Sequence, residues 1–122
     1  MNTAVDYGQI EGGIVQGLGW MTMEEIVYDA NGKLRSSALS TYKVPDIYSV
    51  PKEIAILPLE TERKNLAIFN SKATGEPPLM YGIGAYFAIR SAVKAFNPSV
   101  ELPFDAPFTP EKVLMNLYKS EI

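Results

Sequence analysis

The 122-residue chain contains no cysteine and no histidine. Without cysteine thiolates it cannot hold an iron–sulfur cluster. Without histidine it lacks the commonest side-chain ligand for a metal ion. We therefore predict no metal-ligating residues in this chain.

The composition also lacks a strong charge of either sign. The net charge of −3 offers no basic face for nucleic acid, whereas 47% hydrophobic and 20% charged residues favour a folded core over disorder. No apolar run is long enough to span a bilayer, and the N-terminus lacks a basic-then-apolar signal pattern. These absences predict a cytoplasmic chain that binds neither nucleic acid nor membrane.

Hydrophobic periodicity and turn residues predict an α+β fold with helices and short antiparallel strands, forming one domain at most over residues 1–122. Helices are expected at residues 8–23, at 77–96 and from 110 onward. Strands are expected at residues 25–28, 34–39, 53–59 and 66–69. Asn31-Gly32 is a strong hairpin signal between the first two strands.

The helix predicted at 77–96 is apolar nearly all round, which is typical of a helix buried in a larger body. Only Arg90 and Lys94 are expected to face solvent. The last helix has Thr109 as its predicted cap and Pro110 at its first position. Its inward-facing residues are expected to be Val113, Leu114 and Leu117.

Glycines are unusually frequent in the first predicted helix. Each interior glycine costs about 1 kcal/mol relative to alanine, so four of them cost on the order of 3–4 kcal/mol. The four are Gly12, Gly13, Gly17 and Gly19. Such a penalty requires an offsetting reason.

Two faces can be drawn on this helix. One is an apolar stripe of Ile10, Ile14, Leu18 and Met21. The other carries small and amide residues: Gln9, Gly12, Gly13 and Gln16. This second face allows either the approach of a flat polar ligand or tight packing of the helix against a sheet, and the residues alone favour neither.

The segment Ser71–Pro78 places a lone carboxylate, Glu76, between Gly75 and Pro77. Pro77 disfavours the helical region for Glu76, and a proline suits the first turn of the following helix. Glu76 is therefore expected at a helix start. An acidic residue there commonly does no more than complement the helix dipole, but the geometry also suits a charged group aimed at a ligand.

These motifs together resemble one known family. The runs Asp6–Gly13, Gln16–Gly19, Glu24-Glu25, Ser40–Pro45 and Ser71–Pro78 are similar, in order and spacing, to the C-terminal part of the molybdenum-cofactor subunit of the xanthine dehydrogenase and aldehyde oxidase family. The resemblance extends nearly to the end of the chain.

The resemblance implies roles for individual residues. Glu76 matches the catalytic glutamate of the family, a general base that removes a proton from the attacking oxygen, which derives from water. Gln9 matches a glutamine that hydrogen-bonds the molybdopterin cofactor. Lys72 and Gly75 lie in the Glu76 loop and are expected to shape the cofactor site.

The resemblance also implies a larger assembly. The family's molybdenum subunit is several times longer, so we expect a fragment that is inactive when isolated. Molybdopterin would be bound in the complete enzyme, which would hydroxylate a purine, an aldehyde or a heterocycle. Iron–sulfur clusters and FAD are expected on other domains or subunits, alongside the remainder of the molybdenum subunit as a partner.

A different class of function remains open. The chain could be a cofactor-free association module, whose glycine face and apolar helix bind other protein chains. Apolar surface left uncovered by missing neighbours favours oligomers, so the isolated chain is expected to self-associate.

Overall fold

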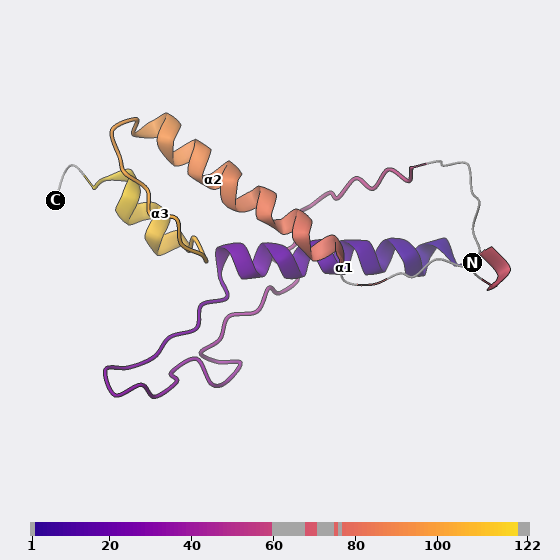
Figure 1. Cartoon of the computed structure of the whole chain (residues 1–122), viewed down its shortest axis with the longest axis horizontal. Helices are drawn as coiled ribbons and strands as arrows, with labels where there is room; N and C mark the ends of the chain where they lie inside the picture. The colour runs from indigo at the N-terminus through magenta and orange to yellow at the C-terminus, as the bar shows by residue number, and fades with distance from the viewer. Residues whose placement is uncertain (1, 60–67, 71–74, 76, 120–122) are drawn as a thin grey trace.

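The computed structural model describes residues 2–59, 68–70, 75 and 77–119. Its elements, in chain order, are helices and 3₁₀ turns (Figure 1). They are α1 (Thr3–Thr22), η1 (Ile68–Asn70), η2 (Pro77–Gly82), α2 (Ile83–Phe96) and α3 (Pro110–Leu117). Over these ranges no strand forms, so the predicted α+β fold with antiparallel strands is wrong and the architecture is helical.

Helix α1 is confirmed, but it begins at Thr3 rather than at Gly8. Asn2 caps it, because the Asn2 Oδ1 accepts a hydrogen bond of 3.2 Å from the Ala4 amide. An asparagine at this position satisfies one of the free amides of the first turn. The extra turn therefore follows from a capping residue that the periodicity did not reveal.

The hairpin turn at Asn31-Gly32 is confirmed, although its strands are not. Gly32 takes a φ of 76°, and its amide donates to the Asp29 carbonyl at 2.9 Å. Pairing then ends after a single antiparallel bridge between Tyr28 and Leu34. A two-stranded ribbon without a third strand or a covering helix has little independent stability.

The other predicted strands also fail where they are described. Residues 53–59 run with no ladder partner among the described residues, and Leu57 is 90% exposed. Residues 68–70 form the 3₁₀ turn η1, whereas 66 and 67 lie outside the described ranges. A β-type sequence pattern favours extended backbone, but a strand exists only where another strand satisfies its amides and carbonyls.

The helix predicted at 77–96 is confirmed in extent but has two parts. Its first six residues form the 3₁₀ helix η2, and α2 continues from Ile83 to Phe96. Two successive prolines, Pro77 and Pro78, supply no amide hydrogens to this first turn. The helix is not buried all round in this chain, since Tyr86 and Val93 are buried whereas Tyr81 is exposed.

The core gathers where α2, α3 and the segment between them meet the C-terminal end of α1. Its buried apolar residues are Tyr86, Val93, Val100 and Phe108. The Phe108 amide donates to the Met21 carbonyl at 2.8 Å, which ties this segment to α1. The Tyr86 and Phe108 rings pack edge to face with centroids 6.0 Å apart.

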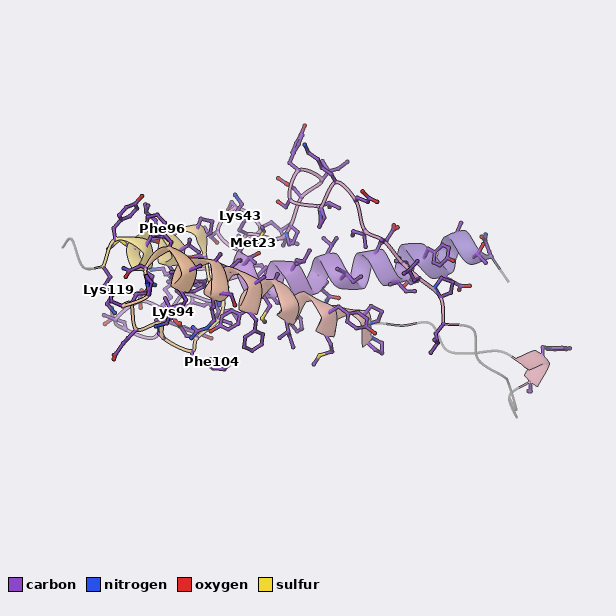
Figure 2. All side chains as sticks on the ribbon, turned by 90° about the horizontal axis from the view of Figure 1, so that it is seen from above. Met23, Lys43, Lys94, Phe96, Phe104 and Lys119 are labelled. Atoms are coloured by element: carbon purple, nitrogen blue, oxygen red, sulfur yellow. The ribbon has the colours of Figure 1, made fainter. Side chains whose placement is uncertain are left out.

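Arg90 is not simply solvated, contrary to the prediction. It is half-buried and donates to the carbonyls of Leu102, at 3.2 Å, and Pro103. Its guanidinium lies 5.3 Å from the centroid of the Phe104 ring. Figure 2 shows Phe104 beside α2, so the hydrogen bonds of Arg90 hold residues 102–104 against this helix. Lys94 is exposed, as predicted.

Helix α3 begins as predicted, with Thr109 accepting a 3.3 Å hydrogen bond from the Lys112 amide and with a proline in its first turn. Val113 and Leu117 pack against the core. Leu114 does not, because it is 57% exposed. The prediction of an inward Leu114 was therefore wrong.

Large apolar side chains remain on the surface of the described residues. Examples above 80% exposure are Leu39, Ile47, Tyr48, Leu57, Leu59 and Phe69. In the same residues, no helix combines the length and the apolarity needed to cross a lipid bilayer.

Candidate cofactor-contacting site

Two elements far apart in sequence come into backbone contact where η2 lies on α1. Gly17 of α1 and Gly82 at the end of η2 are both buried. A Cβ built on Gly17 would lie only 2.9 Å from the carbonyl carbon of Leu79 and 3.2 Å from the Gly82 Cα. The two backbones are in direct contact here, which only glycine permits.

A second contact lies one turn earlier on α1. A Cβ built on Gly13 would be 3.1 Å from the Pro78 Cβ and 3.3 Å from the Leu79 amide nitrogen. The two elements therefore run in the same direction: Pro78, at the start of η2, lies against Gly13, and Gly82, at its end, lies against Gly17. The start of η2 points toward the N-terminal half of α1.

Gln9 lies on the same row of α1, one turn before Gly13, or about 6 Å along the helix axis. Its side chain is exposed. Positions 9, 13 and 17 share a helix face, because residues four apart are neighbours on the helix surface. The fold thus brings η2 to the glycines that follow Gln9 on its own face.

Four of the five glycines of α1 form two sets, and the fifth, Gly19, lies against the side chains of Glu24 and Pro45. Gly13 and Gly17 are occupied by η2, so the packing interpretation holds for them, although the partner is a 3₁₀ helix rather than a sheet. Gly8 and Gly12 have open space where a Cβ would stand. They line a hollow of about 470 Å³, bordered also by Lys52. This open part has the room and the bare backbone that a flat polar group requires.

The loop that precedes η2 is described only in part. Gly75 is exposed, and a Cβ built on it would meet the Pro77 Cδ at 3.7 Å. Lys72 and Glu76, the other predicted site residues of this loop, lie outside the described residues. On the other side of the loop, η1 lies beyond the N-terminal end of α1 (Figure 1).

Two adjacent glutamates, Glu24 and Glu25, follow the C-terminal end of α1, and the sequence did not predict a structural role for them. Tyr42 donates a 2.6 Å hydrogen bond to Glu24, which raises the pKa of the tyrosine hydroxyl. Glu25 forms an ion pair of 2.9 Å with Lys112 of α3. Burial lowers the pKa of Lys112, but Glu25 and Asp105 outweigh burial and raise it.

These two glutamates border a hollow of about 530 Å³ together with Trp20 and Pro107. Both carboxylates already have partners, so the pair joins α1 to neighbouring segments. In the part of the chain that the structure describes, no three carboxylate, histidine or cysteine side chains cluster as a metal site would require.

Comparison with known proteins shows the family to which the chain is similar. Residues 1–51, which include all of α1, match the family model described as a molybdopterin cofactor-binding domain. The xanthine dehydrogenase/oxidase of Rattus norvegicus is 42% identical over 119 residues, covering 93% of this chain and 9% of that protein. Xanthine dehydrogenase 2 of Arabidopsis thaliana is 39% identical over 126 residues, with 94% and 9% covered.

A solved structure shares the overall fold. Quinoline 2-oxidoreductase from Pseudomonas putida 86 superposes with a TM-score of 0.79 at 31% identity, covering 98% of this chain and 15% of that one. The chain belongs to the xanthine dehydrogenase family of molybdenum hydroxylases, and it spans only 9% of the length of the sequence relatives it matches.

Proposed function

We propose that this chain is the part of a molybdenum-dependent hydroxylase that supplies the catalytic base, Glu76, and one side of the molybdopterin site. The complete enzyme would oxidise an electron-poor carbon of a purine, an aldehyde or an aromatic heterocycle, with oxygen taken from water. Gln9 would hydrogen-bond the pterin, whereas Lys72 and Gly75 would shape the loop around the base. The remaining cofactor contacts would come from the rest of the molybdenum subunit.

One observation supports this proposal most strongly. The 3₁₀ helix that directly follows the Gly75-Glu76 motif packs on the α1 face that carries Gln9, through Gly13 and Gly17. Glu76 immediately precedes Pro77 in the chain, and Pro78 contacts the turn after Gln9. A base and a cofactor-contacting amide must be neighbours in such a site, and this packing favours that outcome.

The donor set fits the cofactor. A pterin is flat and polar, with ring nitrogens and amide-like groups that an exposed glutamine can both donate to and accept from. The open backbone at Gly8 and Gly12, in the same helical turns as Gln9, leaves room for a flat group to approach α1. When bound, the cofactor supplies the two-electron redox chemistry and activates the oxygen that is transferred.

The proposed role of Glu76 is to accept the proton of the attacking oxygen. An ionised carboxylate within hydrogen-bond reach of the attacking oxygen can accept its proton. Proximity to an anionic cofactor would raise the pKa of such a carboxylate. The iron–sulfur clusters and flavin that would carry the electrons away are proposed for other domains or subunits, since this chain has no cysteine.

Replacing Gln9 with alanine is expected to lower pterin occupancy in the enzyme assembled from this chain and the rest of its subunit. Loss of one hydrogen bond to a neutral group costs about 0.5–1.5 kcal/mol, which corresponds to roughly a two- to tenfold weaker hold on the cofactor. The measurement is the molybdenum and pterin content of the purified protein.

Glu111→Ala serves as the control, because it removes a polar side chain of similar size from an exposed position of α3, off the Gln9 face of α1. It should leave cofactor content unchanged. Equal cofactor content in the Gln9 variant and in the wild type would contradict the role assigned to Gln9.

A second candidate function, association through apolar surface, is favoured by the exposed side chains described above. Tyr48 and Phe69, for example, are 94% and 98% exposed. Where such exposed apolar side chains lie together, they form a surface that another protein can cover. In this alternative the chain binds no cofactor and acts only by association.

The isolated 122-residue chain is therefore expected to self-associate as its concentration rises. Light scattering across a concentration series would measure the average mass. A constant monomer mass at high concentration would contradict this prediction. Cofactor bound by the assembled protein would separate the enzyme from a pure association module.

A further inference from the structure

We infer that the backbone contact between Gly17 and Gly82, supported by Gly13, is a positioning device for the proposed site. It would set the distance from Gln9 to the Glu76 motif by fixing where η2 lies along α1. This inference rests on the proposed function, and it assigns a role to three glycines that touch neither substrate nor cofactor. They are therefore positioning residues.

The backbone contact between Gly17 and Gly82 leaves no room for a Cβ on either residue. A Cβ on Gly82 would stand 2.5 Å from the Leu18 amide nitrogen and equally close to the Gly17 Cα. A Cβ on Gly17 would overlap the carbonyl oxygen of Leu79 and lie 2.9 Å from its carbonyl carbon. The obstructing atoms on both sides are backbone, which cannot rotate away as a flexible side chain can.

The contact at Gly13 is less tight than the contact at Gly17. Its built Cβ would meet Pro78 at 3.1 Å, so one extra methyl group would displace the start of η2 by a few tenths of an ångström. This is the end of η2 that adjoins Glu76 in sequence. A change at Gly13 thus acts on the motif more gently than a change at Gly17.

The cost of glycine in α1 supports a positional requirement. Each interior glycine costs a helix about 1 kcal/mol, a penalty that alanine would remove wherever a methyl group could be accommodated. At Gly13 and Gly17 the neighbouring element excludes or crowds that methyl group. Close approach of η2 is therefore what offsets the cost at these two positions.

Small displacements matter for the proposed chemistry. A general base acts within about 2.6–3.2 Å of the proton it removes. A misplacement of 1 Å can reduce turnover about 10²-fold. A methyl group at Gly17 must push η2 away by an amount of this order, because the obstructing atoms are backbone.

The test uses the enzyme assembled from the full chain and the rest of its subunit. We expect turnover per bound molybdenum to fall about 10²-fold in Gly17→Ala and by a smaller factor, about fivefold to tenfold, in Gly13→Ala. KM should change less than twofold in both, because substrate contacts are not removed. Gly84→Ala is the matched control, since open space surrounds that glycine of α2, and its turnover should equal that of the wild type.

A second readout does not depend on activity. The chain has no cysteine, so spin labels can be placed uniquely at Glu11→Cys on α1 and Tyr81→Cys on η2 in the 122-residue chain. The label-to-label distance should lengthen in Gly17→Ala and stay constant in Gly84→Ala. If Gly17→Ala does not fold, the test uses Gly13→Ala, in which the label-to-label distance should lengthen by a smaller amount.

The outcomes separate this inference from the function on which it rests. A lengthened distance with reduced turnover per molybdenum and unchanged KM supports positioning. A lengthened distance with wild-type turnover overturns it, because the glycines would then be structural only. If Glu76→Gln retains full activity, the proposed function fails; if that variant is inactive while Gly13→Ala and Gly17→Ala match the wild type, positioning alone fails.

Discussion

Replacing Glu76 with glutamine is expected to lower turnover about 10²- to 10⁴-fold while molybdenum remains bound. A glutamine keeps the size and hydrogen-bonding reach of the side chain but cannot accept a proton at neutral pH. General-base catalysis alone is typically worth this factor. The variant therefore removes the proposed proton acceptor and leaves the shape of the loop intact.

The measurement is single-turnover oxidation of a purine, an aldehyde and a heterocycle by the assembled enzyme, normalised to its molybdenum content. Glu101→Gln is the matched control, because Glu101 is an exposed glutamate after α2. Activity within tenfold of the wild type in the Glu76 variant would remove Glu76 from the role of base. Loss of molybdenum would instead indicate a structural role.

Replacing Phe108 with alanine is expected to lower the free energy of unfolding by about 3–5 kcal/mol. Phe108 is 1% exposed, and its ring packs edge to face on Tyr86. Its backbone also connects the segment before α3 to Met21 of α1. Removing the ring leaves a cavity at the point where α1, α2 and α3 meet.

Denaturant unfolding of the 122-residue chain, followed by circular dichroism, would measure the change. Phe96→Ala is the comparison, since Phe96 also contacts an aromatic ring, that of Tyr118, but is 62% exposed. Its loss should be about 1 kcal/mol or less, because most of its surface already meets water. Similar losses in the two variants would contradict the assignment of the core.

The helices could be predicted because their signals are local. Thr109 and Pro110 fix the start of α3, and Asn31-Gly32 fixes a turn through the conformation of Gly32 alone. Strands depend on distant partners, so a strand-like run such as that at 53–59 cannot show whether a partner exists. The α+β prediction failed for this reason.

Burial on α1 was harder to predict than the helix itself. The apolar stripe through Ile10 and Leu18 is only half-buried, whereas Gly13 and Gly17 are buried against η2. A hydrophobic pattern does not reveal a contact made by backbone. Among the site residues, spacing alone could not assign Gln9 or Glu76, because an amide on a helix face and an acid at a helix start are both common structural features. The several motifs taken together indicated the family, which the comparisons confirm.

A structure of the assembled enzyme with its cofactor tests the central claim most directly. The quantities to measure are the distances from the Glu76 carboxylate and the Gln9 amide to the bound group. We predict that the amide hydrogen-bonds the pterin and that the carboxylate faces the molybdenum centre, with η2 still seated on Gly13 and Gly17. A Glu76 carboxylate held in an internal ion pair, away from the glycine face of α1, would contradict the account.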